Sequence, residues 1–251
     1  MTATAEVPIS PARGSRTRIV TAGIAACFFG WFPAVPARAD IGATVSIFSD
    51  SRYRGYSLSE GRPVALLDFA YDDPSGFYAG ASGTGVLRKG GDPAPLGFEL
   101  NGGFAKRLSS GTTIDLGFTG SSYSYYSKGG SRKSYAEVYA GISRGFFSSR
   151  IFLSPHYSED GLWTAYWEMN ANVSPGKNWG LDGHVGMLVP LHTPQNQENY
   201  RTAFDLRAGV TRQLGPFSLH ASFVQGVHGS NYYGSSRHSS HALVIGASLP
   251  L

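Results

Sequence analysis

Beyond residue 40, apolar and polar side chains alternate with a period of two residues in most segments of the chain. In segment 163–173 the odd positions carry Trp, Ala, Trp, Met, Ala and Val, whereas the even positions carry Thr, Tyr, Glu, Asn and Asn. Successive side chains of a β-strand point to opposite faces, so this pattern predicts strands with one apolar and one polar face. Twelve such strands are predicted, over residues 41–57, 63–73, 76–88, 97–108, 111–122, 132–146, 148–158, 163–174, 178–191, 200–213, 216–228 and 239–250.

The connections between these strands alternate between short and long. Tight turns such as DDPSG, SSG and LGP alternate with longer, Gly-rich links such as KGGDPAP and HGSNYYGSSRH. Short turns at one end and long polar loops at the other are typical of outer-membrane barrels, whereas the Greek-key connections of soluble sandwiches vary in length. We therefore expect an all-β fold: a single antiparallel up-and-down transmembrane β-barrel of about 12 strands.

The polar face of the predicted strands carries isolated charges in mid-strand. A packed soluble core does not accept buried unpaired charges, so we expect the apolar face to meet lipid and the charged face to line a lumen. Two roles are open for these charges: they set ion selectivity, or they pair with one another and support the barrel. The residues expected to line the pore are Arg52, Arg54, Asp68, Glu99, Asp115, Glu137, Arg150, Glu168, Asp182, Asp205 and Arg207.

The first 39 residues have a different composition from the rest of the chain. Three arginines within 13–18 precede an apolar run over 19–35, and Ala37-Arg38-Ala39 has the small-x-small form of a signal peptidase site. We expect a secretory signal peptide over residues 1–39, cleaved between Ala39 and Asp40, and an outer-membrane barrel over residues 40–251. A second possibility is lipoprotein-type cleavage before Cys27, which follows Ile24-Ala25-Ala26.

Cleavage after residue 39 changes the charge balance. Removing four arginines and one glutamate from 21 basic and 17 acidic residues leaves 17 and 16, a net charge of +1. The basic character of the whole chain therefore comes largely from the leader, and composition gives no support to a nucleic-acid partner. The only cysteine, Cys27, is also removed, which excludes a disulfide within the mature chain.

The stretch SDSRYRGYSLSEGRPVALLDFAYDDPSGFYAG, residues 49–80, resembles the opening of the TorF-like porin family of proteobacterial outer-membrane proteins. The resemblance rests on Ser49-Asp50, on Arg54-Gly55 and on GFYAG at 76–80. It implies an outer-membrane β-barrel with porin activity, and it supplies no catalytic residue and no cofactor. Together with the charged face, it predicts a channel for passive diffusion of small polar solutes or ions, and no enzymatic activity.

Two other functions remain open from the sequence. An outer-membrane lipid hydrolase or esterase would use His156, Ser158 and Asn170, because an activated serine needs a histidine and a polar group that orients it. A non-channel structural or adhesive barrel would use the loops at 123–133 and 228–240, which are rich in Tyr, Ser and Gly.

Three histidines, His228, His238 and His241, cluster near the last loop, but their spacing matches no known set of metal ligands, so we expect neither a metal nor a cofactor.

The expected location is the cell outer membrane. The expected partners are outer-membrane lipid and lipopolysaccharide, the barrel assembly machinery, and small polar solutes or ions. The chain ends in Leu251, where many barrels carry an aromatic residue. The oligomeric state stays open, since trimeric porins and monomeric barrels share these sequence signals.

Overall fold

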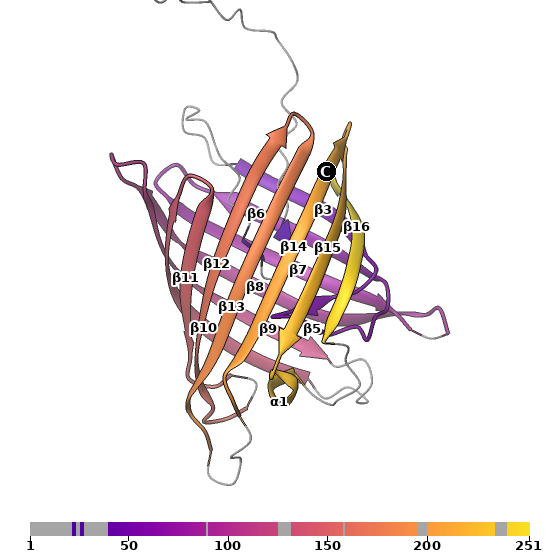
Figure 1. Ribbon diagram of the computed structural model, residues 1–251, viewed down its shortest axis with the longest axis vertical. Coiled ribbons are helices and arrows are strands. Elements are labelled where there is room, and N and C mark those ends of the chain that lie inside the picture. The colour runs from indigo at the N-terminus through magenta and orange to yellow at the C-terminus, as the bar shows by residue number, and fades with distance from the viewer. Residues whose placement is uncertain are drawn as a thin grey trace, which may run out of the picture.

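The computed structural model describes residues 40–88, 90–124, 132–157, 159–194, 200–233 and 240–251, together with 22–23 and 26–27. Within these ranges twelve antiparallel strands form a closed barrel (Figure 1). Each strand pairs with its neighbours along the chain, and the last one pairs with the first. The barrel strands are β3 (Asp40–Phe48), β6 (Val64–Asp72), β7 (Phe77–Leu87), β8 (Pro93–Arg107), β9 (Thr113–Ser124), β10 (Arg132–Arg144), β11 (Phe147–Ser154), β12 (Trp163–Gly176), β13 (Trp179–His192), β14 (Ala203–Leu214), β15 (Phe217–Val227) and β16 (His241–Pro250).

The described residues also form a few short elements that are not part of the barrel wall. Strands β1 (Ala22–Gly23) and β2 (Ala26–Cys27) pair with each other, and β4 (Arg52–Tyr53) pairs with β5 (Tyr56–Ser57) in a small hairpin. A single helical turn, α1, covers Ser230–Tyr233. No helix in the described part of the chain has the length and apolar character needed to cross a membrane.

The twelve strands confirm the fold class predicted from the sequence, and eleven of them lie within about four residues of their predicted bounds. The prediction for the first strand, residues 41–57, was wrong in its second half. Strand β3 ends at Phe48, and the chain then turns into the β4–β5 hairpin. The connection between β7 and β8 is also shorter than predicted, because β8 begins at Pro93.

Burial alternates along the strands as the period-two pattern predicts. In β6 the side chain of Asp68 is 4% exposed, whereas its neighbours Leu67 and Phe69 are 39% and 49% exposed. Every barrel strand contributes large exposed hydrophobic residues, so the outer surface is a continuous apolar belt. Hydrocarbon offers no hydrogen-bond partners to a polypeptide backbone, and a closed ring of paired strands satisfies the backbone without water. The outer surface and the pairing therefore suit a barrel that spans a membrane.

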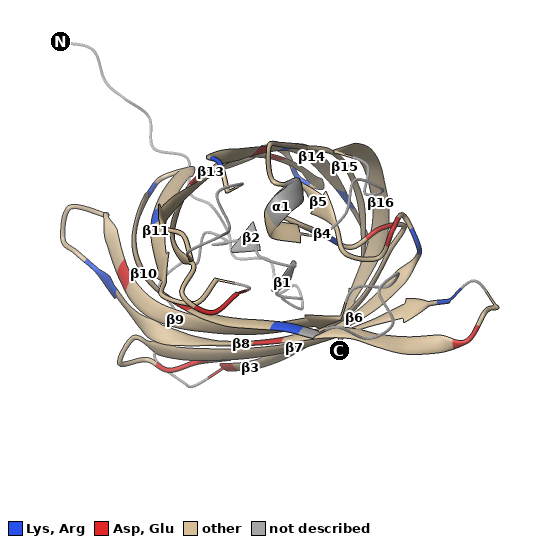
Figure 2. Ribbon diagram, turned by 90° about the horizontal axis from the view of Figure 1, so that it is seen from below, with Lys and Arg blue, Asp and Glu red and all other residues tan. Residues whose placement is uncertain are grey.

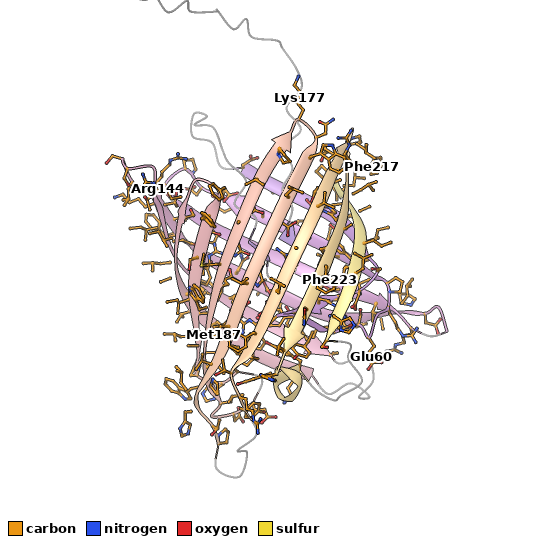
Figure 3. All side chains as sticks on the ribbon, viewed as in Figure 1. Glu60, Arg144, Lys177, Met187, Phe217 and Phe223 are labelled. Carbon is orange, nitrogen blue, oxygen red and sulfur yellow. The ribbon has the colours of Figure 1, made fainter. Side chains whose placement is uncertain are left out.

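The two ends of the barrel differ. Figure 3 shows Arg144 and Lys177 near one end and Glu60 toward the other. The end with Arg144 and Lys177 carries short turns, of which 145–146 and 177–178 contain two residues each. The other end carries the longer connections, including 49–63, 193–202 and 228–240. We call it the loop end.

Aromatic residues mark both ends of the apolar belt. Trp163 begins β12 at the loop end, and Trp179 and Phe217 begin β13 and β15 at the opposite end. All three side chains are about half exposed. Aromatic girdles at the two membrane–water interfaces are typical of outer-membrane barrels, and these positions agree with that arrangement.

A charge on the outer face near mid-strand is expected to destabilise the barrel. Phe118 in β9 is 57% exposed and lies opposite Val138 in β10. We expect Phe118→Arg to lower the free energy of unfolding by about 2–4 kcal/mol, the usual cost of a lipid-facing arginine near the bilayer midplane. The measurement is urea unfolding of the protein in lipid vesicles, with Phe118→Leu as the matched apolar control. Equal stability of the two variants would mean that this face does not meet lipid.

Candidate functional site

The segment between β3 and β6, residues 49–63, folds into the barrel. Figure 2 shows β4 and β5 inside the ring of strands. Most of the segment is buried, although it is rich in polar residues. We call residues 50–59 the inner hairpin; all of them except Arg52 are buried.

The carboxylate of Asp50 holds the base of the inner hairpin together. Its Oδ1 accepts hydrogen bonds from the hydroxyls of Ser57, at 2.5 Å, and Ser59, at 2.8 Å, and from the backbone N–H of Gly61 at 3.1 Å. Its Oδ2 accepts from Nε of Arg52 at 2.8 Å. One carboxylate thus accepts hydrogen bonds from both arms of the segment, so the hairpin in the lumen is stabilised by its own internal hydrogen bonds.

The tip of the inner hairpin is a two-residue turn. Both central residues have positive φ, 45° at Arg54 and 84° at Gly55, as a type I′ turn requires. A left-handed conformation costs a non-glycine residue about 1–2 kcal/mol, so Arg54 needs compensating contacts. Gly55 has no room for a side chain, because a Cβ there would lie 2.6 Å from Cα of Gly226 in β15. The tip therefore rests directly on the backbone of the barrel wall.

The side chain of Arg54 reaches the opposite side of the lumen. Its Nη2 donates to Oε2 of Glu137 in β10 at 2.7 Å, and Glu137 is 2% exposed. The guanidinium carbon lies 3.8 Å from the ring centroid of Tyr166 in β12, and 5.0 Å from those of Tyr53 and Tyr157. These distances allow cation–π contacts, which are strong at a desolvated site. Since β10 and β15 are five steps apart in the ring of twelve strands, the tip spans the lumen.

Aromatic rings surround the inner hairpin at the loop end. The ring of Tyr53 lies within 6.1 Å of those of Tyr123, Tyr135 and Tyr233. Tyr56 stacks on Tyr233 of α1 with 5.2 Å between the ring centroids. Burial raises the pKa of the Tyr53 phenol well above its ordinary value, so this hydroxyl stays protonated. The loop end of the lumen is therefore filled mainly by aromatic packing.

The sequence analysis did not find this aromatic layer. It assigned the inward face of the strands to polar residues along their whole length. At the loop end that face instead carries buried apolar side chains, such as Val64, Leu66 and Leu96. Two signals in the sequence were available: these apolar residues on the polar face, and the tyrosines within the connections, among them Tyr56 and Tyr233.

A cavity of about 170 Å³ lies next to the inner hairpin, with walls from β3 and from β8 to β16. It brings together most of the residues that the sequence placed in the pore. Those that line it are Arg52, Arg54, Glu99, Glu137, Glu168, Asp182, Asp205 and Arg207. The other three, Asp68, Asp115 and Arg150, are buried but do not line the cavity. Arg52 and Arg54 were predicted to reach the lumen from the first strand, over 41–57. They reach the cavity from the inner hairpin instead.

The interior arginines pair with carboxylates. Besides the Arg54–Glu137 and Arg52–Asp50 pairs, Nε of Arg150 lies 2.9 Å from Oδ2 of Asp115, and Nε of Arg207 lies 3.1 Å from Oδ2 of Asp182. The Arg54, Arg150 and Arg207 pairs link residues of different strands or join the inner hairpin to the wall. Buried charges need such partners, because an isolated buried charge is very costly.

His184 in β13 bridges two neighbouring strands by hydrogen bonds. Its Nε2 lies 2.8 Å from Oδ1 of Asp205, and its Nδ1 lies 2.7 Å from Oδ1 of Asn170. The Asn170 amide nitrogen donates to Glu168, so the Asn170 oxygen is the atom that faces the ring. Nε2 of His184 also lies 3.1 Å from the hydroxyl of Tyr166, so the imidazole joins a hydrogen-bond network across β12, β13 and β14. The sequence analysis included Glu168 and Asp205 but not His184, whose role depends on contacts across three strands.

The hydrolase grouping of His156, Ser158 and Asn170 is not supported by these positions. His156 is exposed beyond the end of β11, and Asn170 is buried in β12. Ser154, the last residue of β11, pairs with Thr164, and Asn170 lies six residues further along β12, about 20 Å away at the rise of a β-strand. Ser158 lies outside the described residues.

The histidine cluster of the last loop is only partly visible, because His238 also lies outside the described residues. In the ranges that the structure covers, no three His, Cys, Asp or Glu side chains form a group that could hold a metal ion.

Comparison with known proteins gives a family and a fold. A family model described as a bacterial protein of unknown function (Gcw_chp) matches residues 34–244. The comparison with curated proteins found no match. Among solved structures, the chain is similar to the NanC porin, with a TM-score of 0.55 and 10% identity over 83% of this chain and 100% of that one. It is also similar to the KdgM porin, with a TM-score of 0.50 and 9% identity over 83% of this chain and 98% of that one.

Loss of the Arg54 side chain is expected to destabilise the barrel. We expect Arg54→Ala to lower the free energy of unfolding by about 3–5 kcal/mol, because it leaves Glu137 buried without its partner. The double variant Arg54→Ala, Glu137→Ala is expected to recover part of that loss. Urea unfolding measures both, with Arg88→Ala, at an exposed arginine after β7, as the matched control. If Arg54→Ala were as stable as Arg88→Ala, the pair would not hold the hairpin.

Proposed function

The chain belongs to the Gcw_chp family of bacterial proteins, and on that premise we propose that it is a porin-like channel of the outer membrane. It would pass small polar solutes or ions by passive diffusion, with no catalytic step. The observation that carries the proposal is the closed barrel of twelve strands with an apolar outer belt and a charged interior that holds a cavity. Barrels of eight strands are filled by side chains and those of 16–18 leave an open channel, so twelve strands suit a narrow pore.

The inner hairpin is the constriction of this proposed channel. It crosses the lumen from β15 to β10, with Gly55 against one wall and Arg54 bound to Glu137 on the other. Fixed charges at a narrow point act strongly on passing ions, because little water separates them from the solute. We therefore expect a small, selective conductance.

The membrane context supports the same proposal. Residues 1–39 would be removed as a signal peptide with cleavage between Ala39 and Asp40, and the barrel machinery would insert residues 40–251. Lipid and lipopolysaccharide would then cover the apolar belt. The resemblance of 49–80 to the TorF-like porin family points to the same activity.

A second candidate function has one observation in its favour. The dense aromatic packing at the loop end favours a structural or adhesive barrel that does not conduct, with the loops as its contact surface. Permeability separates the two candidates, because only the channel admits solutes.

The test is solute uptake into proteoliposomes by the full-length protein expressed and purified from membranes. We expect swelling with small polar solutes, and a rate that falls as solute size increases. The double variant Arg54→Ala, Glu137→Ala should raise the rate several-fold, because it removes the contact that holds the hairpin across the lumen. Asp115→Ala with Arg150→Ala is the matched control, since this buried pair neither lines the cavity nor touches the hairpin. No swelling by a folded wild-type barrel would favour the second candidate.

A further inference from the structure

Among the residues that the structure describes, the interior of the barrel holds more carboxylates than arginines. Four carboxylates each have an arginine within hydrogen-bond distance, and a fifth lies beside a histidine. The arginine pairs are Asp50–Arg52, Glu137–Arg54, Asp115–Arg150 and Asp182–Arg207, and Asp205 lies beside His184. Three further interior carboxylates, Asp68, Glu99 and Glu168, form no ion pair among the residues that the structure describes.

The partners of these three carboxylates are neutral or absent. Glu99 accepts from the hydroxyls of Ser121, at 3.2 Å, and Tyr123, at 3.0 Å. Glu168 accepts from the amide of Asn170 at 3.3 Å. Neutral donors satisfy an oxygen atom but leave its charge uncancelled. Arg150 faces Glu168 in the β11–β12 register, yet its guanidinium hydrogen-bonds to Asp115.

Several buried side-chain atoms have no hydrogen-bond partner among the described residues, and two of them are carboxylate oxygens that face the lumen from the strands. They are Oδ2 of Asp68 and Oε1 of Glu137, and both side chains are less than 5% exposed. A buried carboxylate oxygen without a donor is costly unless a group from outside the chain serves it. Glu137 lines the cavity, and Asp68 lies on the interior face of β6. These atoms are therefore free acceptors for a cation or its hydration water.

The cavity also presents aromatic faces beside the carboxylates. Tyr139, Phe152 and Tyr166 line it together with Glu99 and Glu168. Two of these rings already contact a guanidinium, since Arg54 lies 3.8 Å from the centroid of Tyr166 and 5.8 Å from that of Phe152. Aromatic rings and carboxylates together favour organic cations, through cation–π and charge attraction.

We infer that the lumen selects cations, including small ammonium and guanidinium solutes, and that Asp68, Glu99 and Glu168 carry this preference. The inference rests on the proposed channel function. In the water-filled lumen of the proposed channel these three carboxylates would be hydrated and ionised, and their negative potential would raise the local concentration of cations and exclude anions. The four arginine–carboxylate pairs contribute little to the selection, because each is balanced within the protein.

The experiment is the reversal potential of the full-length protein in a planar bilayer across a potassium chloride gradient. We expect a permeability ratio of potassium to chloride that is several-fold above one. The triple variant Asp68→Asn, Glu99→Gln, Glu168→Gln should bring the ratio close to one. The matched control neutralises three carboxylates outside the strands, the exposed Asp92 and Asp160 and the partly exposed Asp73, as Asp73→Asn, Asp92→Asn and Asp160→Asn, and should keep the wild-type ratio.

A single variant provides the test if the triple variant does not fold. Glu168→Gln alone should lower the potassium-to-chloride permeability ratio part of the way toward one. Adding methylguanidinium chloride to one side should reduce the potassium current of the wild type more than an equal concentration of sodium chloride does. Conducting steps with a ratio at or below one would overturn the inference and leave the channel function intact. A folded barrel that shows no steps would overturn both.

Discussion

The structure depends on one constraint: in hydrocarbon, every backbone N–H and C=O must find its partner within the protein. A sheet meets this constraint only if its first and last strands join. Here β16 pairs with β3, and the Ser46 and Ser248 hydroxyls lie 2.8 Å apart at the buried side of that seam. Once the barrel is closed, each side chain of a strand points either outward or into the interior. Apolar residues take the outside, and charged residues can lie only inside, where each needs a partner or water.

A ring of twelve strands is too wide for its own inward side chains to fill. The chain fills part of the space with the segment between β3 and β6. Asp50 gathers the hydroxyls of this segment, Gly55 lets the turn approach β15, and Arg54 binds Glu137 across the lumen. Asp50, Arg54 and Gly55, on which the expected TorF-like resemblance partly rests, are thus among the residues that build the inner hairpin. The hairpin occupies part of the lumen and places Arg54 and Glu137 there, and the proposed selective passage rests on this arrangement.

The sequence was sufficient to predict the strands, because the period-two alternation reflects burial directly. Eight of the eleven charged residues expected in a pore line the cavity, and their role in a pore stays a prediction. The sequence did not predict the hairpin: SRYRGYS continues the alternation of the first strand, and Arg-Gly is not the Asn-Gly or Asp-Gly pair that usually marks a two-residue turn. The ion pairs could not be predicted from the sequence either. Arg54 and Glu137 are 83 residues apart in sequence and meet only because the strand register brings them together. The same holds for His184, whose hydrogen-bond partners Asn170 and Asp205 lie in the two strands beside it.

The central claim is that a polar path crosses the membrane through the barrel interior, past the inner hairpin. Single-channel recording of the full-length protein in a planar lipid bilayer tests it most directly. Discrete, reproducible current steps of small and uniform size are the predicted result, because the hairpin leaves one narrow lumen of fixed width. A bilayer that contains correctly folded protein and shows no steps would contradict the account, since the interior would then be closed from one end to the other.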